Sequence, residues 1–121
     1  MVTTTDECGF ILDLVYFARE SSEISRVQAP VIESTAETFR CFARTGEITR
    51  WQVIGYTDDA ERHGAELAHA RAQAVIDALV ARGVSANSLE AVSAAATDPL
   101  DRRGTPDARA KNRRVAFLRS R

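Results

Sequence analysis

The stretch GYTDDAERHGAELAHARA, residues Gly55–Ala72, joins the end of a predicted strand to an acidic loop and the start of a predicted helix. Successive helical residues turn by about 100°, so the apolar residues of this helix gather on one side. That stripe consists of Leu67, Ala70, Ala74, Val75 and Ala78. Arg71 lies close to its centre, where a guanidinium must reach water or an anion because an unpaired buried charge is very costly. Two interpretations stay open: a helix-to-loop salt bridge, or half of a site for a zwitterionic ligand.

The predicted elements on either side of this stretch describe one small domain. The chain has 121 residues, of which 45% are hydrophobic and 27% charged, as in an ordinary globular protein with one core. Residues 1–9 are expected to form a flexible leader, and Pro30 fits the first turn of a helix that ends at Gly46. Periodicity predicts strands at 10–18, 48–56, 88–96 and 113–121, helices at 30–46 and 64–82, and a helical turn near 108–111.

The resulting order β-α-β-α-β-β predicts an α+β fold, a two-layer sandwich in which both helices pack on one face of one small mixed sheet. The longest near-apolar run, GFILDLVYFA, is interrupted by Asp13 and is too short to span a bilayer. No basic segment precedes it, so we expect neither a signal peptide nor a membrane helix in this chain.

Charge is unevenly distributed along the chain. Residues 102–121 hold half of the 16 basic residues but only one of the 17 acidic residues, Asp107. A basic segment on an acidic body attracts anions, but Phe117 is its only aromatic residue, so a stacking platform for nucleic acid is missing. We therefore expect no nucleic-acid partner. The basic segment is either a surface for another anionic partner or a solvated face that balances the acidic body.

The two cysteines, Cys8 and Cys41, show no metal-binding or nucleophile pattern. Cys41 falls on the helix face opposite the apolar stripe and is expected to be exposed. A disulfide would require an oxidising compartment and a suitably placed N-terminal segment. The sequence therefore favours unpaired cysteines, with the disulfide as the alternative.

Motifs for catalysis are absent from the sequence. There is no Gly-rich phosphate loop, no G-x-S-x-G elbow and no Walker lysine. His63 and His69 do not share a helix face, and we expect surface histidines rather than metal ligands. The carboxylates Asp58, Asp59 and Glu61 precede a helix and are expected to cap it and complement its dipole. No enzyme activity, cofactor or metal is predicted.

Four segments resemble the OmpA-like peptidoglycan-binding domain of outer-membrane proteins, Pal-type lipoproteins and flagellar stator subunits. VYFARESSEIS (15–25) is similar to the family's opening strand and loop, and VIGYTD (53–58) to its I-x-G-H-T-D strand end. LAHARAQAVIDALVARGV (67–84) resembles the family helix, and ARAKNRRV (108–115) resembles G-R-A-x-N-R-R-V. The resemblance covers nearly all of residues 10–121, in the family's order.

The resemblance implies non-covalent binding of peptidoglycan through the diaminopimelate of the stem peptide, in the periplasm or cell envelope. By family position, Asp58 takes the ligand ammonium and Arg71 its carboxylate, and we expect Asp58 to offset Arg71 in the empty site. Thr57 orients Asp58 or contacts the ligand, and Gly64 occupies the place of a family asparagine. Arg114 is expected to meet a further carboxylate of the stem peptide.

The chain departs from the family pattern around these residues. Tyr56 replaces the family histidine, Ala68 replaces a serine, and the interval between Asp58 and Arg71 is shorter. These departures keep open an alternative function: an interaction or assembly module that has lost peptidoglycan binding and forms a homodimer. For the NRRV segment, the alternative interpretation makes Asn112 a helix cap and the arginines surface ion-pair partners.

Overall fold

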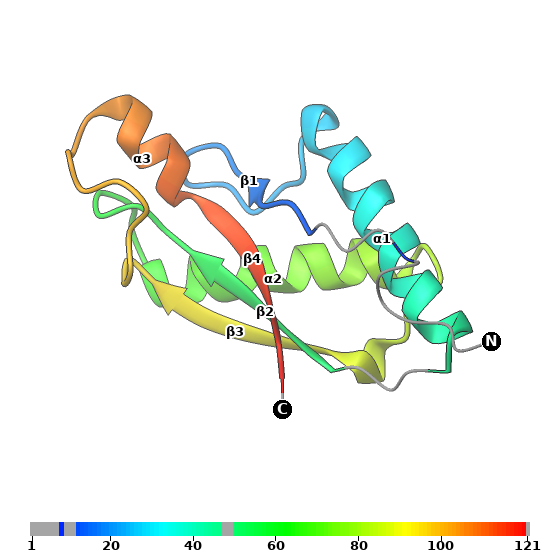
Figure 1. The fold of residues 1–121 in the computed structure, drawn as a ribbon. Coiled ribbons are helices and arrows are strands. Elements are labelled where there is room, and N and C mark those ends of the chain that lie inside the picture. The colour runs from blue at the N-terminus through cyan, green and yellow to red at the C-terminus, as the bar shows by residue number, and fades with distance from the viewer. Residues whose placement is uncertain (1–7, 9–11, 47–49, 121) are drawn as a thin grey trace.

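The computed structural model describes residue 8 and residues 12–46 and 50–120. Its elements are β1 (Val15–Tyr16), α1 (Ala29–Arg44), β2 (Trp51–Tyr56), α2 (Gly64–Val80), β3 (Leu89–Ala95), α3 (Pro106–Asn112) and β4 (Arg114–Arg119), with short 3-10 turns at Arg26–Gln28 and Ala86–Ser88. The sheet order is β1-β4-β2-β3. β4 runs antiparallel to β1 and β2, and β3 runs parallel to β2 (Figure 1).

Alternation along β2 sends every second side chain into the core, as the sequence predicts. Trp51 and Val53 are buried, and the ring of Trp51 packs against Phe39 and Phe42 of α1. The same core contains the buried face of α2, including Ala72, Val75, Ile76 and Leu79. Both long helices therefore cover one face of the mixed sheet, and the predicted α+β sandwich is confirmed.

The contact between β2 and α2 depends on Gly55. A Cβ atom at this position would lie 1.8 Å from the main-chain oxygen of Ala68, which is far inside van der Waals contact. Glycine therefore lets the end of β2 approach the first turns of α2 closely. This approach places Tyr56 and the acidic loop directly beside the side chain of Arg71.

Two elements differ from the sequence prediction. In the described residues β1 is a short edge strand, whose ladder with its single neighbour β4 consists of Val15 and Tyr16. α3 is a helix rather than a single helical turn. Thr105 accepts a hydrogen bond from the N–H of Ala108, and Pro106 occupies the first turn, a pattern that starts helices.

The preference for unpaired cysteines is wrong, because Cys8 and Cys41 form a disulfide. Cys41 is half-buried rather than exposed, and the bond fixes Cys8, within the predicted leader, to α1. The rest of that leader lies outside the described residues. None of the helices in the described part of the chain combines the length and apolar character needed to cross a membrane.

Candidate functional site

Arg71 is fully buried, as its place in the apolar stripe predicts. The stripe itself is shifted from the predicted one: the buried residues around Arg71 are Ala68, Ala72, Val75, Ile76 and Leu79. A guanidinium has five N–H donors, and each of these has an acceptor. Nε donates to the carbonyl of Ser21 at 2.8 Å. Nη1 donates one hydrogen bond to the carbonyl of Tyr56 at 3.0 Å, and Nη2 donates one to the carbonyl of Ala18 at 3.1 Å. The remaining two donors form a bidentate pair with Glu61 at 2.7 and 2.5 Å.

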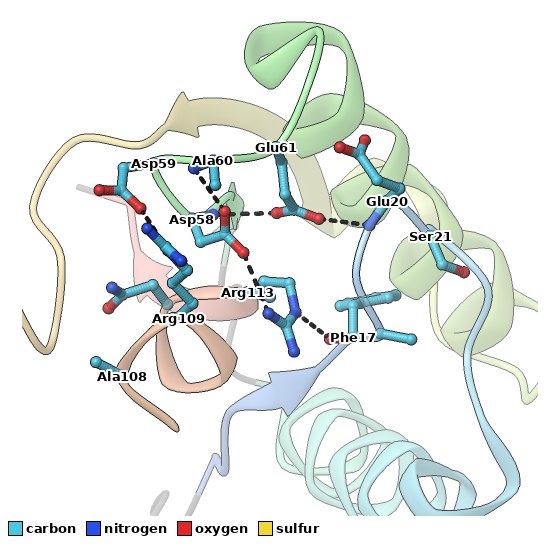
Figure 2. A network of polar contacts seen from close by, with 12 residues as sticks. Phe17, Glu20, Ser21, Asp58, Asp59, Ala60, Glu61, Ala108, Arg109 and Arg113 are labelled. Carbon is cyan, nitrogen blue, oxygen red and sulfur yellow. Dashed lines mark hydrogen bonds and ion pairs between the residues drawn. The ribbon is translucent and has the colours of Figure 1, made fainter. Parts of the chain in front are cut away.

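The partner of Arg71 is therefore Glu61 and not Asp58, which corrects the sequence prediction. The side chain of Glu61 has no exposed surface, so it does not cap α2 as predicted either. Each of its oxygens accepts one N–H of Arg71 and one main-chain N–H, from Asp58 at 3.0 Å and from Glu20 at 2.7 Å. The four contacts fill the hydrogen-bonding capacity of a carboxylate. Figure 2 shows the two main-chain contacts.

Asp58 lies next to this pair and has a guanidinium of its own. Its side chain is 1% exposed, and one carboxylate oxygen accepts from Nη1 of Arg113 at 3.1 Å. The other oxygen accepts from the N–H of Ala60 at 2.8 Å. Arg113 also donates from Nε to the carbonyl of Phe17 at 2.9 Å (Figure 2). Two buried ion pairs thus meet at the end of β2, linked by the hydrogen bond between Asp58 and Glu61.

Arg113, rather than the predicted Arg114, is the arginine of the NRRV segment that reaches this cluster. Arg114 neighbours the core residue Val115 in β4, so its side chain leaves the other face of the sheet. There it stacks on the ring of Tyr56 at 3.7 Å and donates to the carbonyl of Asp98. Burial lowers the pKa of Arg114 below its usual value. Nη1 of Arg114 is buried and has no hydrogen-bond partner.

Thr57 lines a hollow beside the cluster, and Gly64 lies next to the Thr57 side chain. The Thr57 hydroxyl is buried without a hydrogen-bond partner, and a Cβ at Gly64 would lie 3.2 Å from it. Gly64 is the first residue of α2, and the N-cap position before it is His63, whose φ is 51°. The hollow, about 220 Å³, is lined by Thr57, Asp59, Ala96, Pro99, Asp101, Arg102, Gly104, Arg109 and Asn112.

A clasp joins the loop after β1 to the loop before α2. Glu20 donates its N–H to Glu61, and its carboxylate accepts the N–H of Arg62 at 2.9 Å. Glu20, with φ of 57°, and His63 adopt left-handed backbone, which is strained for residues other than glycine. The outer surface of this clasp is exposed at Asp59, Ala60 and Arg62.

The basic segment is engaged by the acidic body of the protein. Arg109 contacts Asp59, Arg103 and Lys111 contact Asp101, and Arg113 contacts Asp58. Asn112 does not cap α3. Its amide accepts from the N–H groups of Leu100 and Asp101 and donates to the carbonyl of Asp101, which holds the 97–101 loop.

A larger hollow of about 520 Å³ lies at the start of β2, away from the cluster, beside Phe39, Arg40, Arg50 and Val84. It contains no buried carboxylate–guanidinium pair. Within the described ranges, no group of three or more His, Cys, Asp or Glu side chains is arranged to hold a metal ion. The cluster at the end of β2 is the stronger candidate site because it combines buried charge with directed donors.

The family assignment follows from comparison with known proteins. A sequence model of the OmpA family matches residues 16–113. The chain belongs to the OmpA family. The peptidoglycan-binding protein ArfA of Mycobacterium tuberculosis is 41% identical over 71 residues. That match covers 57% of this chain and 22% of ArfA, so the chain corresponds to a minor part of its relative.

Solved structures of OmpA-family domains share the fold. The C-terminal domain of MotB from Helicobacter pylori gives a TM-score of 0.79 at 28% identity, covering 90% of this chain and 84% of that domain. The cell wall anchor of the T6SS from Pseudomonas aeruginosa gives a TM-score of 0.70 at 26% identity, covering 84% of this chain and 72% of that chain. The peptidoglycan-associated lipoprotein from Burkholderia pseudomallei gives a TM-score of 0.79 at 24% identity, covering 88% of this chain and 89% of that chain. At this identity the match shows likeness of fold alone. By name, ArfA is a peptidoglycan-binding protein and the T6SS protein is a cell wall anchor. As a member of the OmpA family, the chain is non-catalytic.

Proposed function

We propose that this chain binds peptidoglycan non-covalently through the diaminopimelate of the stem peptide and anchors an envelope protein or complex to the cell wall. The observation that carries the proposal is a complete carboxylate receptor beside a buried carboxylate. Arg71 and two main-chain N–H groups hold one carboxylate, and Asp58 lies next to it. An amino-acid head group requires this combination of an anion and a cation.

Each residue of the cluster receives a role in this proposal. The ligand carboxylate takes the place that Glu61 fills, on Arg71 and the N–H groups of Asp58 and Glu20. The ligand ammonium lies against Asp58, whose oxygens have capacity beyond their contacts with Ala60 and Arg113.

Neighbouring residues complete the ligand environment in this proposal. The unpartnered hydroxyl of Thr57 supplies a polar contact, and the absent side chain at Gly64 leaves room beside it. Arg114 lies on the other face of the sheet, so its proposed contact is with a more distant part of the stem peptide.

A periplasmic location fits the disulfide and the relatives. Disulfides persist in oxidising compartments, and Cys8 is bonded to Cys41. The related MotB structures include a periplasmic domain at 27% identity, and the T6SS relative is a cell wall anchor. We therefore propose that the domain works in the periplasm or cell envelope.

The test is co-sedimentation with diaminopimelate-type sacculi, with and without excess free diaminopimelate. We expect the wild type to pellet, free ligand to release it, and Arg71→Ala and Asp58→Ala to stay in the supernatant. Asp59→Ala is a matched control, because Asp59 is an exposed carboxylate of the same loop that pairs with Arg109. Folding of each variant is checked by circular dichroism. A folded wild type that stays in the supernatant contradicts the proposal.

One observation favours the alternative of an interaction or assembly module that has lost the ligand. All five N–H groups of Arg71 are already satisfied within the chain, and its side chain is fully buried. This alternative predicts no sacculus binding by the wild type or by any variant of the loop. A homodimer, detected by light scattering on a size-exclusion column, would then indicate self-assembly.

A further inference from the structure

We propose that Glu61 is an internal competitor of the ligand: its carboxylate occupies the receptor on Arg71 and must leave before an external carboxylate binds. This inference rests on the proposed function and adds a residue that sets affinity and specificity. The conformation in which Glu61 pairs with Arg71 is then the closed form of the site.

The contacts of Glu61 are those of a bound ligand. Its side chain has no exposed surface, and its two oxygens hold two donors each. Two of the donors belong to Arg71 in bidentate geometry, the arrangement that guanidinium groups use to recognise carboxylates. A ligand carboxylate cannot reach these donors while Glu61 holds them, so the two are mutually exclusive.

The position of Glu61 in the chain allows it to leave. Its backbone belongs to the short loop between β2 and α2, whose neighbours Ala60 and Arg62 are exposed. The loop is held by the clasp in which the Glu20 carboxylate accepts from the N–H of Arg62. Glu20 and His63 carry strained left-handed backbone on the two sides of the clasp. Opening the clasp would swing Glu61 outward and relieve these conformations.

Charge balance explains why the competitor selects a zwitterion. In the closed form Arg71 is paired with Glu61, and Asp58 with Arg113. A carboxylate alone only exchanges one anion for another on Arg71. A ligand that also brings an ammonium to Asp58 adds a contact that Glu61 cannot make. Specificity therefore arises from the ligand's advantage over an internal rival.

The test compares meso-diaminopimelate with pimelate, the same dicarboxylate without its ammonium groups, by isothermal titration calorimetry. Glu61→Gln removes the charge of the competitor while keeping its shape. We expect it to bind diaminopimelate about tenfold tighter than the wild type, because a larger fraction of molecules has an open receptor. Pimelate is expected to bind each protein more weakly than diaminopimelate does, because it brings no ammonium to Asp58. Glu66→Gln is the control, since Glu66 is an exposed carboxylate in the first turn of α2.

A second variant covers the case in which Glu61→Gln does not fold. Glu20→Ala keeps the buried pair and removes only the carboxylate that accepts from Arg62. It weakens the clasp, so it should also bind diaminopimelate more tightly than the wild type.

The outcomes separate the two proposals. If the wild type binds diaminopimelate and the affinity is unchanged or weaker in Glu20→Ala and in folded Glu61→Gln, Glu61 is not a competitor and the proposed function stands. If neither the wild type nor any folded variant binds diaminopimelate, the proposed function fails, and the inference fails with it.

Discussion

At the scale of single residues, the protein buries the carboxylates of Asp58 and Glu61 and the guanidinium of Arg71 almost completely, while Arg113 is partly exposed. Removing charges from water is costly, and the attraction within a buried pair offsets this only with good geometry and further hydrogen bonds. Arg71 and Glu61 meet both conditions through bidentate contact and the surrounding main-chain groups. Loss of one partner leaves the other buried and unpaired.

We predict that Arg71→Met lowers the free energy of unfolding by about 3–5 kcal/mol, because it strands the buried carboxylate of Glu61. The double variant Arg71→Met/Glu61→Leu should recover most of this loss, since an apolar pair carries no desolvation cost. Urea unfolding of the two single variants and the double variant measures the coupling. A loss below about 1 kcal/mol in Arg71→Met, the range of exposed ion pairs, would contradict the burial of the pair.

At the scale of elements, the close contact between β2 and α2 sets the position of the site. Gly55 pairs with Val115 of β4 on one side and lies against Ala68 of α2 on its face. The strand therefore delivers Tyr56, Thr57 and Asp58 beside the helix that carries Arg71. Any widening between the two elements separates the two halves of the cluster.

Gly55→Ala should destabilise the protein by about 1–3 kcal/mol or more, because its Cβ would lie 1.8 Å from a main-chain oxygen that cannot rotate away. Gly64→Ala is the comparison, since its Cβ meets the Thr57 hydroxyl at 3.2 Å and that side chain can move. Thermal unfolding of both variants provides the measurement. Equal stability of the two variants would show that the strand and helix are not in tight contact.

The disulfide between Cys8 and Cys41 connects the N-terminal segment to α1 and closes a loop with a sequence separation of 33. In the chain-entropy account, a loop of this length contributes about 3–4 kcal/mol to stability. We predict that a reductant lowers the unfolding temperature of the wild type and leaves Cys8→Ser/Cys41→Ser unchanged. Calorimetry with and without the reductant provides the comparison, and a wild type insensitive to reduction contradicts it.

The elements that follow from periodicity could be predicted, and the pairings between side chains could not. The spacing of apolar residues in α2 indicates that Arg71 is buried, and burial requires an anion. Three carboxylates precede the helix, and sequence distance does not show which of them pairs with Arg71. The choice of Glu61 depends on the loop backbone and on donors from Glu20, far away in the chain. The sequence prediction gave only a helical turn near 108–111, although Thr105 and Pro106 carry the signal that starts α3.

At the scale of the whole molecule, charges from both ends of the chain converge at one edge of the sheet. The loop after β1, the loop before α2 and the residues around α3 contribute Glu20, Glu61, Asp58, Asp59, Arg109 and Arg113 (Figure 2). The basic C-terminal segment thus pairs with acidic residues of the body, through exposed contacts at Asp59 and Asp101 and a largely buried one at Asp58. A wall anchor needs such a site on a rigid support, and the OmpA-family fold supplies it with a sheet backed by two helices.

The most direct test of the central claim is a titration of the isotope-labelled wild type with meso-diaminopimelate, followed by NMR. The signals to observe are the main-chain N–H groups of Glu20 and Asp58, which donate to the Glu61 carboxylate, and the Nε–H of Arg71, which reports on the guanidinium that holds the same carboxylate. We predict saturable shifts of all three with diaminopimelate and much smaller shifts with pimelate, which carries no ammonium, at equal concentration. Unchanged signals at diaminopimelate concentrations that release the protein from sacculi would show that the ligand binds elsewhere.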